Sequence, residues 1–392
     1  MRTASEHDVI IVGAGPGGAT AATALAQKGL DVLLIDRHSF PRDKICGDAI
    51  SLGCIKIMND LGMKPKIEAA EARGEFHRLD AMRLVGPSGH SIRAEFKRGP
   101  YGEESFVSPR VFFDAIIQQQ AVESGARFVQ AEVKEPLMED GRVVGVIARD
   151  NGEAKAHRSQ VVIGADGVTS VIMRHLRSEA DQHVDLHRAV ALRAYIEGIE
   201  LFPHEVEFFL YDDILPGYAW IFPAGDQVAN VGLGMRLDRF RALKKNLKVM
   251  LRDFLEMPAI RERAENGVTV RDVAIWQLNF GSQKDLQHAY DGALLVGDAA
   301  GFINPLTGGG IENALISGQL AADTIEEALR KGNVSRNALR SYEQRCREEL
   351  WSGMRKSFLY QRLLLNFPGL IDFLIRYLGQ HGGLAKTFIS KL

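Results

Sequence analysis

Short, unbroken apolar runs recur along the chain, and each ends in glycine or aspartate. A run of this kind is typical of a β-strand that is buried on both faces, as strands of a parallel sheet are. A segment rich in small residues with helical spacing follows the first and the last of these runs. The pattern therefore predicts strands of a parallel α/β sheet at residues 9–12, 32–35, 161–164 and 293–296.

The pattern changes to alternation of apolar and polar positions between residues 188 and 280. Alternation indicates strands with one solvated face, which is the usual pattern of antiparallel sheets. One segment, residues 239–255, interrupts the alternation and predicts a helix. We expect antiparallel strands at residues 189–195, 206–211, 228–233 and 268–280.

Turn and cap residues place further elements. A Gly-Pro-Ser-Gly sequence inside residues 76–96 predicts a hairpin. Ser108 is a suitable N-cap, with Pro109 in the first turn, for a helix that follows. Asp48 is expected to cap a helix at 49–61. A strand meander is expected at 128–164 and helical structure from residue 337 onward.

Composition and charge narrow the function classes. The 392 residues are 46% apolar and 25% charged, as expected for a soluble globular protein of several lobes. A net charge of −2 gives no argument for nucleic-acid binding. Three scattered cysteines, Cys46, Cys54 and Cys346, form no metal motif or disulfide framework and fit a reducing cytoplasm. The polar leader and the lack of a run of about 18 apolar residues predict neither a signal peptide nor a spanning helix.

The tail contains one strongly apolar stretch, residues 358–377, which Asn366, Pro368 and Asp372 interrupt. We expect a helix pair packed on the body of the protein. The alternative is an interfacial surface that makes peripheral contact with the inner face of a membrane. The expected location is therefore cytoplasmic, with peripheral membrane contact as the alternative.

The first apolar run leads into Gly13, Gly15 and Gly18, in the pattern G-x-G-x-x-G. The first glycine permits a sharp turn, the second a close approach of backbone to a pyrophosphate, and the third close packing of helix on strand. The helix N-terminus offers free N–H groups to phosphate. Asp36 ends the second strand, where a carboxylate accepts both ribose hydroxyls and repels a 2′-phosphate. An ordinary glycine-rich turn explains one or two of these features but not all, so we predict an FAD or NAD site.

Two later segments bring small residues and an acid to strand ends, where ligands of α/β proteins gather. Asp166 lies in a Gly-Ala-Asp-Gly sequence, and Asp298 follows the last apolar run. A loop with three glycines, 308–310, precedes a helix near Ile311, whose N-terminus can face the edge of a flavin ring. Arg110 in a first helical turn points to an anionic partner, although a surface salt bridge explains it nearly as well.

Two segments are candidates for a substrate cavity. Tyr218, Trp220 and Phe222 lie on one face of a predicted strand because side chains alternate. They form either an aromatic core face or an apolar wall over a ligand. Cys46 precedes Gly47, which permits a close approach of a ligand. From its residue type alone, the cysteine is more simply a small buried hydrophobe.

The order of these motifs resembles the FAD-dependent group that includes the aromatic hydroxylases, the flavin halogenases and the geranylgeranyl reductases. The resemblance covers the chain to about residue 325. Within this group, the chain is most similar to the geranylgeranyl reductase family, since its segment PRDKICGDA resembles that family's Cys-Gly segment beside the flavin. GYAWIFP likewise resembles its Tyr-x-Trp-x-Phe-Pro motif, which lines the isoprenoid cavity.

The resemblance implies roles for individual residues. The three glycines would contact the pyrophosphate, Asp36 the adenosine ribose, Arg110 the cofactor chain and Asp298 the ribityl or pyrophosphate. Cys46, Tyr218, Trp220 and Phe222 would border the substrate, with Cys46 as the candidate catalytic acid and no metal. The implied cofactor-binding set is Gly13, Gly15, Pro16, Gly18, Asp36, Arg37, Gly47, Arg110, Val133, Asp166, Gly297, Asp298, Gly309, Gly310 and Ile311.

Three departures from the family pattern concern the substrate rather than the cofactor. One residue, Gly217, separates Pro216 from Tyr218, where the reductases often have two. Met173 stands where the group usually has an arginine. The late loop is Gly-Gly-Gly at 308–310, where the family often has Gly-Glu-Gly.

The resemblance implies an FAD-dependent oxidoreductase that reduces isoprenoid double bonds of a prenyl lipid or prenyl diphosphate by hydride transfer from flavin N5. The alternative is a monooxygenase or halogenase that uses a flavin hydroperoxide. Halogenases also need a lysine between flavin and substrate, for which the sequence suggests no position. A third hypothesis is a non-catalytic flavoprotein or lipid-binding module. The electron donor is NADH, NADPH or a donor protein such as ferredoxin, and no nucleic-acid partner is expected.

The implied fold is α/β with two domains. A discontinuous Rossmann-like FAD-binding domain would contain residues 1–75, 104–180 and 285–325. An antiparallel-sheet substrate domain would contain residues 76–103 and 181–284. A C-terminal helical region would contain residues 326–392.

Overall fold

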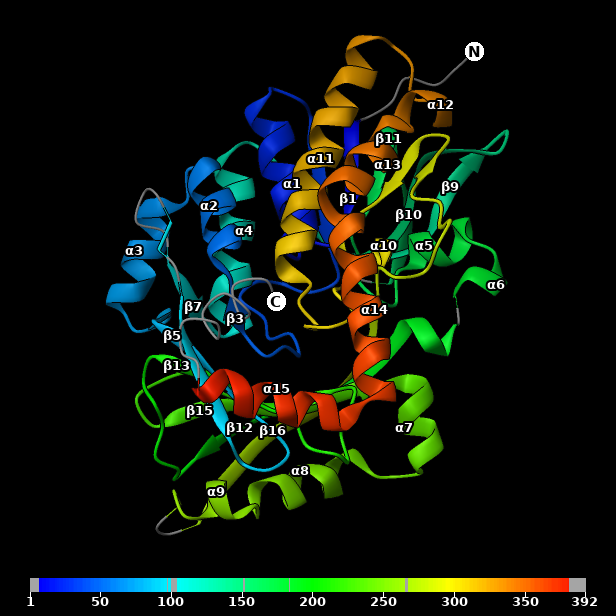
Figure 1. The fold of residues 1–392 in the computed structure, drawn as a ribbon. Helices are drawn as coiled ribbons and strands as arrows, with labels where there is room; N and C mark the ends of the chain where they lie inside the picture. Colours follow the sequence, from blue (N-terminus) through cyan, green and yellow to red (C-terminus); the bar gives the residue numbers. More distant parts are fainter. Residues whose placement is uncertain are drawn as a thin grey trace.

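An eight-stranded sheet and a seven-stranded sheet form the two halves of the molecule (Figure 1). The computed structural model describes residues 7–96, 98–99, 104–150, 152–182, 184–264 and 267–380. The mixed α/β fold with parallel and antiparallel sheets confirms the predicted fold class.

The first sheet is built around β1 (His7–Val12), which is almost fully buried. Its neighbours are parallel, with Val12 opposite Ile35 on one side and Gly164 on the other. The strand order is β17 (Ala289–Tyr290), β18 (Ala293–Leu295), β11 (Glu153–Gly164), β1, β2 (Val32–Asp36) and β8 (Arg127–Gln130). The outer part of β11 pairs with β10 (Arg142–Asp150), and β10 pairs with β9 (Glu132–Glu139), so these three strands form a meander as predicted. The start of the predicted meander is wrong, because β8 pairs in parallel with β2 instead of with β9.

Small residues allow the helices of this half to pack closely. Helix α1 (Pro16–Gln27) packs against α4 (Arg110–Glu123) and α11 (Ile311–Arg330). A Cβ on Gly318 of α11 would overlap the carbonyl oxygen of Gly17, so glycine is required at this crossing. The start of α11 near Ile311 is as predicted.

The second sheet is antiparallel except at one pair, β13 with β5. Its strands β5 and β6 form the predicted hairpin and join strands from the second half of the chain. The order is β16 (Thr269–Asn279), β12 (Arg188–Glu197), β15 (Val228–Arg236), β14 (Tyr218–Pro223), β13 (Glu205–Phe209), β5 (Ala81–Val85) and β6 (Ser91–Glu95). A third, small sheet contains β3 (Ala49–Ile50), β7 (Ser105–Val107) and β4 (His77–Leu79).

The helix predicted at 49–61 is wrong at its start. Residues Ala49–Ile50 form β3, and α2 covers only Leu52–Asp60. The cap is Ser51, whose Oγ accepts a hydrogen bond from Cys54 N at 3.3 Å, and not Asp48. Asp48 instead has a left-handed backbone with φ 65° and is fully buried.

Two other helix predictions also need correction. The segment 239–255 is two helices, α7 (Leu237–Leu243) and α8 (Leu247–Leu255), because Lys244 is left-handed and Asn246 caps the second helix. Helix α4 begins at Arg110 with Pro109 as its N-cap, so the Ser108 hydroxyl is not the cap. The remaining helices of this part are α3 (Lys64–Ala72), α5 (Val171–Leu176), α6 (Glu179–Gln182), α9 (Pro258–Arg261) and α10 (Gly297–Ala300).

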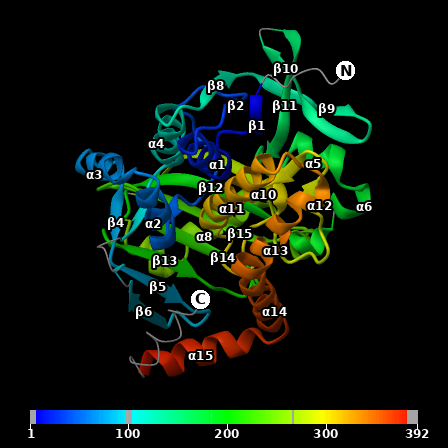
Figure 2. The ribbon, with the colours of Figure 1, turned by 90° about the horizontal axis from the view of Figure 1, so that it is seen from above.

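The C-terminal region is helical as predicted as far as residue 380, and residues 381–392 of the predicted region lie outside the described residues. Helices α12 (Arg336–Leu339) and α13 (Ser341–Cys346) lead through a π-helical turn into α14 (Ser352–Asn366) and α15 (Pro368–Gln380). Figure 2 shows α15 at the edge of the molecule opposite β9 and β10. Within the part of the chain that the structure describes, we find no helix with the length and apolarity needed to cross a membrane.

Candidate functional site

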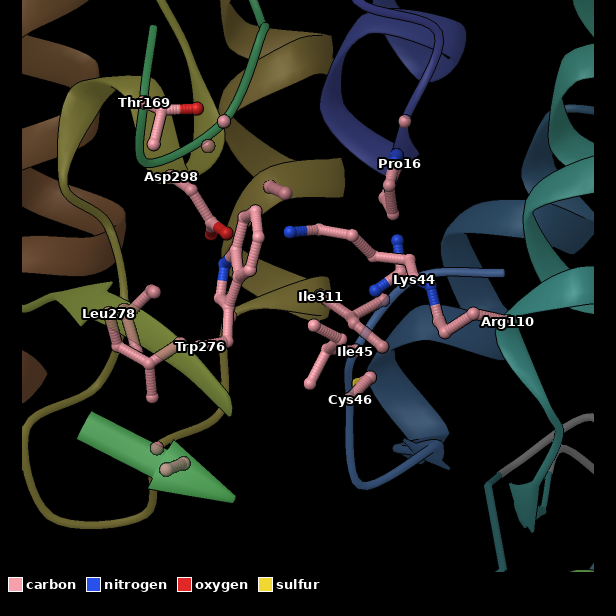
Figure 3. A pocket seen from close by; sticks show the side chains of 18 of the residues that line it. Pro16, Lys44, Ile45, Cys46, Arg110, Thr169, Trp276, Leu278, Asp298 and Ile311 are labelled. Carbon is pink, nitrogen blue, oxygen red and sulfur yellow. The ribbon is translucent and has the colours of Figure 1, made fainter. Parts of the chain in front are cut away.

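A cavity of about 460 Å³ runs from the ends of the parallel strands to the face of β14. The residues after β1, β2, β11 and β18 all contribute to its lining. Figure 3 shows the middle of this cavity, with side chains converging from both halves of the molecule. Its position matches the crevice at the carboxyl ends of parallel strands where α/β proteins bind ligands.

The glycine-rich loop closes one end of the cavity. Gly13 has φ 100°, and a Cβ there would overlap the backbone of Ala165. A Cβ on Gly18 would overlap the carbonyl oxygen of Gly13. A Cβ on Gly15 would meet only the guanidinium of Arg42, at 3.8 Å, so this glycine leaves the backbone open to the cavity. Gly13 and Gly18 therefore permit close packing, and Gly15 exposes the helix N-terminus.

Asp36 fixes this loop as well as lining the cavity. Its carboxylate accepts hydrogen bonds from Ala14 N at 2.8 Å and His38 N at 2.9 Å. Each oxygen keeps a second lone pair that can accept a ribose hydroxyl. The carboxylate thus lies where the sequence predicts an adenosine contact.

Two arginines lie beside the loop and share one acid. Arg110 contacts Asp114 at 2.6 and 2.8 Å, and Arg42 contacts the same carboxylate at 2.7 Å. Arg110 and Asp114 are both buried, so the interaction is not the surface salt bridge considered above. One carboxylate against two guanidinium groups leaves net positive charge at the cavity wall, as a pyrophosphate needs.

Lys44 and Trp276 meet in the middle of the cavity (Figure 3). The Lys44 ammonium lies 3.7 Å from the centre of the Trp276 ring, a cation–π contact. Burial lowers the pKa of Lys44 to about 8, although Asp298 acts in the opposite direction. Burial also raises the pKa of Asp298. A cation of this kind can neutralise an anionic ligand in the cavity.

The late glycine loop reaches the cavity from the other side. Gly310 precedes α11 and supplies no side-chain cap, so the first N–H groups of that helix are open to a ligand. The Tyr218 hydroxyl donates a hydrogen bond to the Thr307 carbonyl. The loop is therefore tied directly to the aromatic strand.

Tyr218, Trp220 and Phe222 form one face of β14, as predicted. The ring centroids of successive residues lie 5.9 and 6.1 Å apart, and Phe208 of β13 packs against Tyr218 and Phe222. Trp220 is 7% exposed and Phe222 is 4% exposed, but all three β14 side chains line the cavity. The rings are thus both a core face and an apolar cavity wall.

The Cys46 loop packs against this wall. A Cβ on Gly47 would lie 3.2 Å from Phe222 and 3.5 Å from Trp220 Nε1, so glycine permits the close approach. The Asn230 amide donates to the Cys46 carbonyl at 2.8 Å and to the Asp48 carboxylate at 2.7 Å. Tyr195 also donates to Asp48, at 2.6 Å. Burial raises the pKa of Asp48 to about 6.

The Cys46 thiol is half-buried and lines the cavity. Burial raises the pKa of the thiol, although Arg110 opposes the shift. The thiol is therefore protonated at neutral pH and can donate a proton. Figure 3 shows Cys46 below Ile45 and Ile311.

Most of the predicted site residues line this one cavity, and two do not. Gly18 packs inside the loop, and Gly309 bonds to Asn304 and Thr307 within the late loop. Asp166 lines the cavity, but its carboxylate accepts hydrogen bonds from Ser170 and Val171. The others that line it are Gly13, Gly15, Pro16, Asp36, Arg37, Cys46, Gly47, Arg110, Val133, Tyr218, Trp220, Phe222, Gly297, Asp298, Gly310 and Ile311.

Sequence reasoning missed Lys44, Trp276, Arg42 and Asn230. Lys44 and Arg42 belong to the charged loop before Cys46, and their charge was the available signal. Trp276 lies in an alternating strand, where nothing distinguishes a cavity residue from a surface one. Among the described residues, no group of three or more His, Cys, Asp or Glu side chains is arranged to hold a metal ion.

The cavity fits FAD. An exposed glycine, an open helix N-terminus, two arginines and an acid at the end of β2 all line it. These groups match a pyrophosphate and a ribose. The second open helix N-terminus, at α11, also lines the cavity beside Asp298, and a flavin ring bound there would extend toward the aromatic wall.

Comparison with known proteins agrees with this geometry. Residues 6–357 match the model of the FAD binding domain family. A digeranylgeranylglycerophospholipid reductase from Methanocella arvoryzae is 32% identical over 359 residues, which cover 90% of this chain and 86% of the relative. A similar reductase from Methanothrix thermoacetophila is 34% identical, covering 88% and 83%.

A solved structure is also similar over most of its length. The geranylgeranyl bacteriochlorophyll reductase-like protein of Thermoplasma acidophilum superposes with a TM-score of 0.81 at 28% identity, covering 93% of this chain and 90% of that one. Flavin-dependent halogenases share the fold at lower identity.

Proposed function

The chain belongs to the geranylgeranyl reductase family of FAD-dependent oxidoreductases, and on that premise we propose that it reduces isoprenoid double bonds of a prenyl lipid. Membership in a family of enzymes removes the hypothesis of a non-catalytic lipid-binding module. The curated relatives act, by their names, on a digeranylgeranylglycerophospholipid. We extend that substrate class, a phospholipid with geranylgeranyl chains, to this chain, and we propose a prenyl diphosphate as the alternative substrate.

The observation that carries the proposal is the aromatic wall at the far end of the dinucleotide cavity. Tyr218, Trp220 and Phe222 present three adjoining rings to the cavity, beside the Cys46 loop. An apolar, flexible isoprenoid chain loses water-exposed surface against such a wall. The ring faces also attract positive charge, which develops on carbon when a double bond is protonated.

Reduction of a double bond needs one hydride and one proton. FAD, when bound and reduced, supplies the hydride. The Cys46 thiol supplies the proton in our proposal, because it faces the cavity and, with its pKa raised by burial, still carries its proton at neutral pH. A water molecule bound there is the alternative source. Hydride and proton add to the two carbons, so the double bond becomes a single bond.

The electron donor is part of the proposal. The sequence has one G-x-G-x-x-G motif, which the FAD site uses. We therefore propose a donor that binds transiently, either a nicotinamide nucleotide or a small electron-transfer protein such as ferredoxin.

A single-turnover experiment tests the reductase and the role of Cys46. Reduced holoenzyme is mixed anaerobically with a geranylgeranyl phospholipid, and the return of oxidised-flavin absorbance is followed. We expect reoxidation by the lipid, slowed about 100-fold in Cys46→Ala if the thiol is the acid. An unchanged rate in Cys46→Ala assigns the proton to water, and no reoxidation by any prenyl lipid rejects the reductase.

The second candidate is an oxygen-dependent halogenase, because halogenases need a lysine between flavin and substrate and Lys44 lines the cavity. The Lys44 ammonium contacts the Trp276 ring and faces Asp298. Rapid mixing of reduced holoenzyme with oxygen separates the two functions. In a reductase, the absorbance of oxidised flavin should return in one phase. In a halogenase, it should return only after a long lag, during which a flavin hydroperoxide persists.

A further inference from the structure

The last two helices expose apolar side chains where a surface helix normally has polar ones. Leu359 is 66% exposed on α14, and Phe373 is 61% exposed on α15. We call the full set the apolar ridge. It consists of Leu359, Tyr360, Leu363, Phe367, Leu370, Phe373 and Tyr377.

The opposite face of each helix is packed on the protein, so the ridge faces outward. On α14, Met354 and Gln361 are buried. On α15, Ile371, Ile375 and Leu378 are buried in a cluster with Ile92 and Ala94 of β6. Helix α15 is thus apolar on two faces. An ordinary surface helix has one apolar stripe, and a second one indicates another apolar environment.

The charged side chains of α14 and α15 themselves are mostly positive. Residues 352–380 contain one acid, Asp372, which accepts hydrogen bonds from Ser88 Oγ at 2.6 Å and Ser88 N at 3.1 Å. The cations of this segment are Arg355, Lys356, Arg362 and Arg376, and all are exposed. The segment therefore has a net charge of +3, although the whole chain has −2. Apolar side chains among exposed cations are typical of helices that lie on anionic lipid.

The ridge is connected to the cavity through α14. Gln361 lines the cavity and donates a hydrogen bond to the Pro305 carbonyl at 2.5 Å. Ser357, one turn earlier, accepts a bond from Asn304 at 3.2 Å. The loop that borders the cavity thus lies on one face of α14, and the ridge lies on the other.

We propose that the apolar ridge docks the protein on the surface of an anionic phospholipid bilayer. The apolar side chains enter the interface, and the four cations pair with lipid phosphates. Two copies of this chain joined through the ridge would bring two positively charged surfaces together, which disfavours a dimer. If the proposed function is also right, docking places the cavity beside the membrane that contains its lipid substrate; this consequence rests on the proposed function, whereas the docking itself does not.

Co-sedimentation with vesicles tests the docking on the full-length holoenzyme. We expect binding to phosphatidylcholine vesicles that contain phosphatidylglycerol, and much weaker binding to phosphatidylcholine alone. The affinity of the double variant Leu359→Gln/Phe373→Gln for the anionic vesicles should be lower by about ten-fold or more. Arg355→Gln should reduce binding to anionic vesicles about five-fold, with little effect on neutral ones.

The matched control is Val249→Gln, since Val249 is 43% exposed on α8 and is not part of the ridge. It should bind as the wild type does. Equal binding of the wild type and the double variant would overturn the proposal. The proposal would also be overturned if light scattering without lipid showed a dimer of the wild type and a monomer of the double variant, because the ridge would then be a dimer interface. A Phe373→Trp variant checks the geometry, because its fluorescence should shift to the blue only with anionic vesicles.

Activity on detergent-dispersed lipid separates the two proposals. Full activity on detergent-dispersed lipid, without vesicle binding, rejects docking through the apolar ridge and supports the proposed reductase function. Vesicle binding without reduction of any prenyl lipid supports docking through the apolar ridge and rejects the proposed reductase function.

Discussion

Trp220 donates its indole N–H to the side-chain oxygen of Asn230, with 2.9 Å between Nε1 and Oδ1. The amide nitrogen of the same asparagine donates to the Cys46 carbonyl and to the Asp48 carboxylate. Asn230 is fully buried on β15, opposite Phe222. One side chain therefore sets both the orientation of the central ring of the wall and the position of the cysteine loop.

Removing this link should impair the substrate end of the cavity and leave the cofactor end intact. Asn230→Ala should lower kcat/KM for the prenyl substrate about ten-fold or more, because Trp220 and the Cys46 loop lose their common partner. The unpaired buried groups should lower the free energy of unfolding by about 1–3 kcal/mol. FAD affinity should change less than about two-fold. Steady-state kinetics, urea unfolding and flavin titration measure the three effects.

Tyr195→Phe is the matched control, since Tyr195 donates to the same Asp48 carboxylate and has no hydrogen bond with Trp220. It should lose about 1 kcal/mol of stability and keep kcat/KM near the wild-type value. Equal kinetic losses in both variants would show that general destabilisation, and not positioning, explains the effect.

The glycine loop makes a second prediction. Gly18→Ala should weaken FAD binding about 100-fold or more, because a Cβ there overlaps the Gly13 carbonyl and displaces the loop. Gly29→Ala is the control: Gly29 has φ 80° at the end of the same helix, with no atom within 4 Å of a Cβ. It should cost about 1 kcal/mol of stability without changing FAD affinity. Flavin fluorescence titration distinguishes the two.

Lys44 should make FAD binding depend on pH. Burial lowers its pKa to about 8, so the free protein loses this charge above that pH. Anionic FAD favours the ammonium form, and binding above pH 8 must therefore take up a proton. FAD affinity should fall as pH rises through this range, and Lys44→Gln should bind more weakly without the pH dependence.

Calorimetric titration in buffers of different ionisation enthalpy measures the proton uptake directly. Lys28→Gln serves as the control, because Lys28 pairs with Asp323 and Glu326 outside the cavity. It should behave as the wild type. The same pH slope in Lys44→Gln and the wild type would contradict the assignment.

Asp48 should make stability depend on pH in the opposite sense to a salt-bridged acid. Its pKa is raised from 3.8 to about 6, so the folded protein binds a proton more tightly than the unfolded chain does. The free energy of unfolding should fall by up to about 3 kcal/mol as pH rises from 3.8 to 6, and then level off. Asp48→Asn keeps an acceptor for Tyr195 and Asn230 and should remove that slope. Urea unfolding over this pH range would contradict the assignment if both proteins showed the same slope.

The parts of the site that could be predicted are those that local sequence determines. The strand, glycine turn, helix and Asp36 are contiguous, so apolar pattern and glycine spacing were sufficient. The aromatic wall also followed from alternation within β14. Asp48, in contrast, was predicted as a helix cap, but Ser51 is closer to the helix and Asp48 bonds to Asn230, 182 positions away.

Long-range contacts of this kind leave no periodic signal. From the sequence, Lys44 is one charge in a predicted surface loop. In the structure it lines the cavity and contacts Trp276, which β16 contributes from a distant part of the chain. The helix predicted at 239–255 failed for a local reason, since the left-handed Lys244 and the Asn246 cap divide it.

The central claim is that the protein adds hydrogen to isoprenoid double bonds. The most direct measurement is the mass of a digeranylgeranyl phospholipid after anaerobic incubation with the chemically reduced holoenzyme. We expect products heavier by successive pairs of hydrogen atoms, and no such products from Trp220→Ala with FAD still bound. An unchanged lipid mass with fully reduced, FAD-loaded enzyme would contradict the claim.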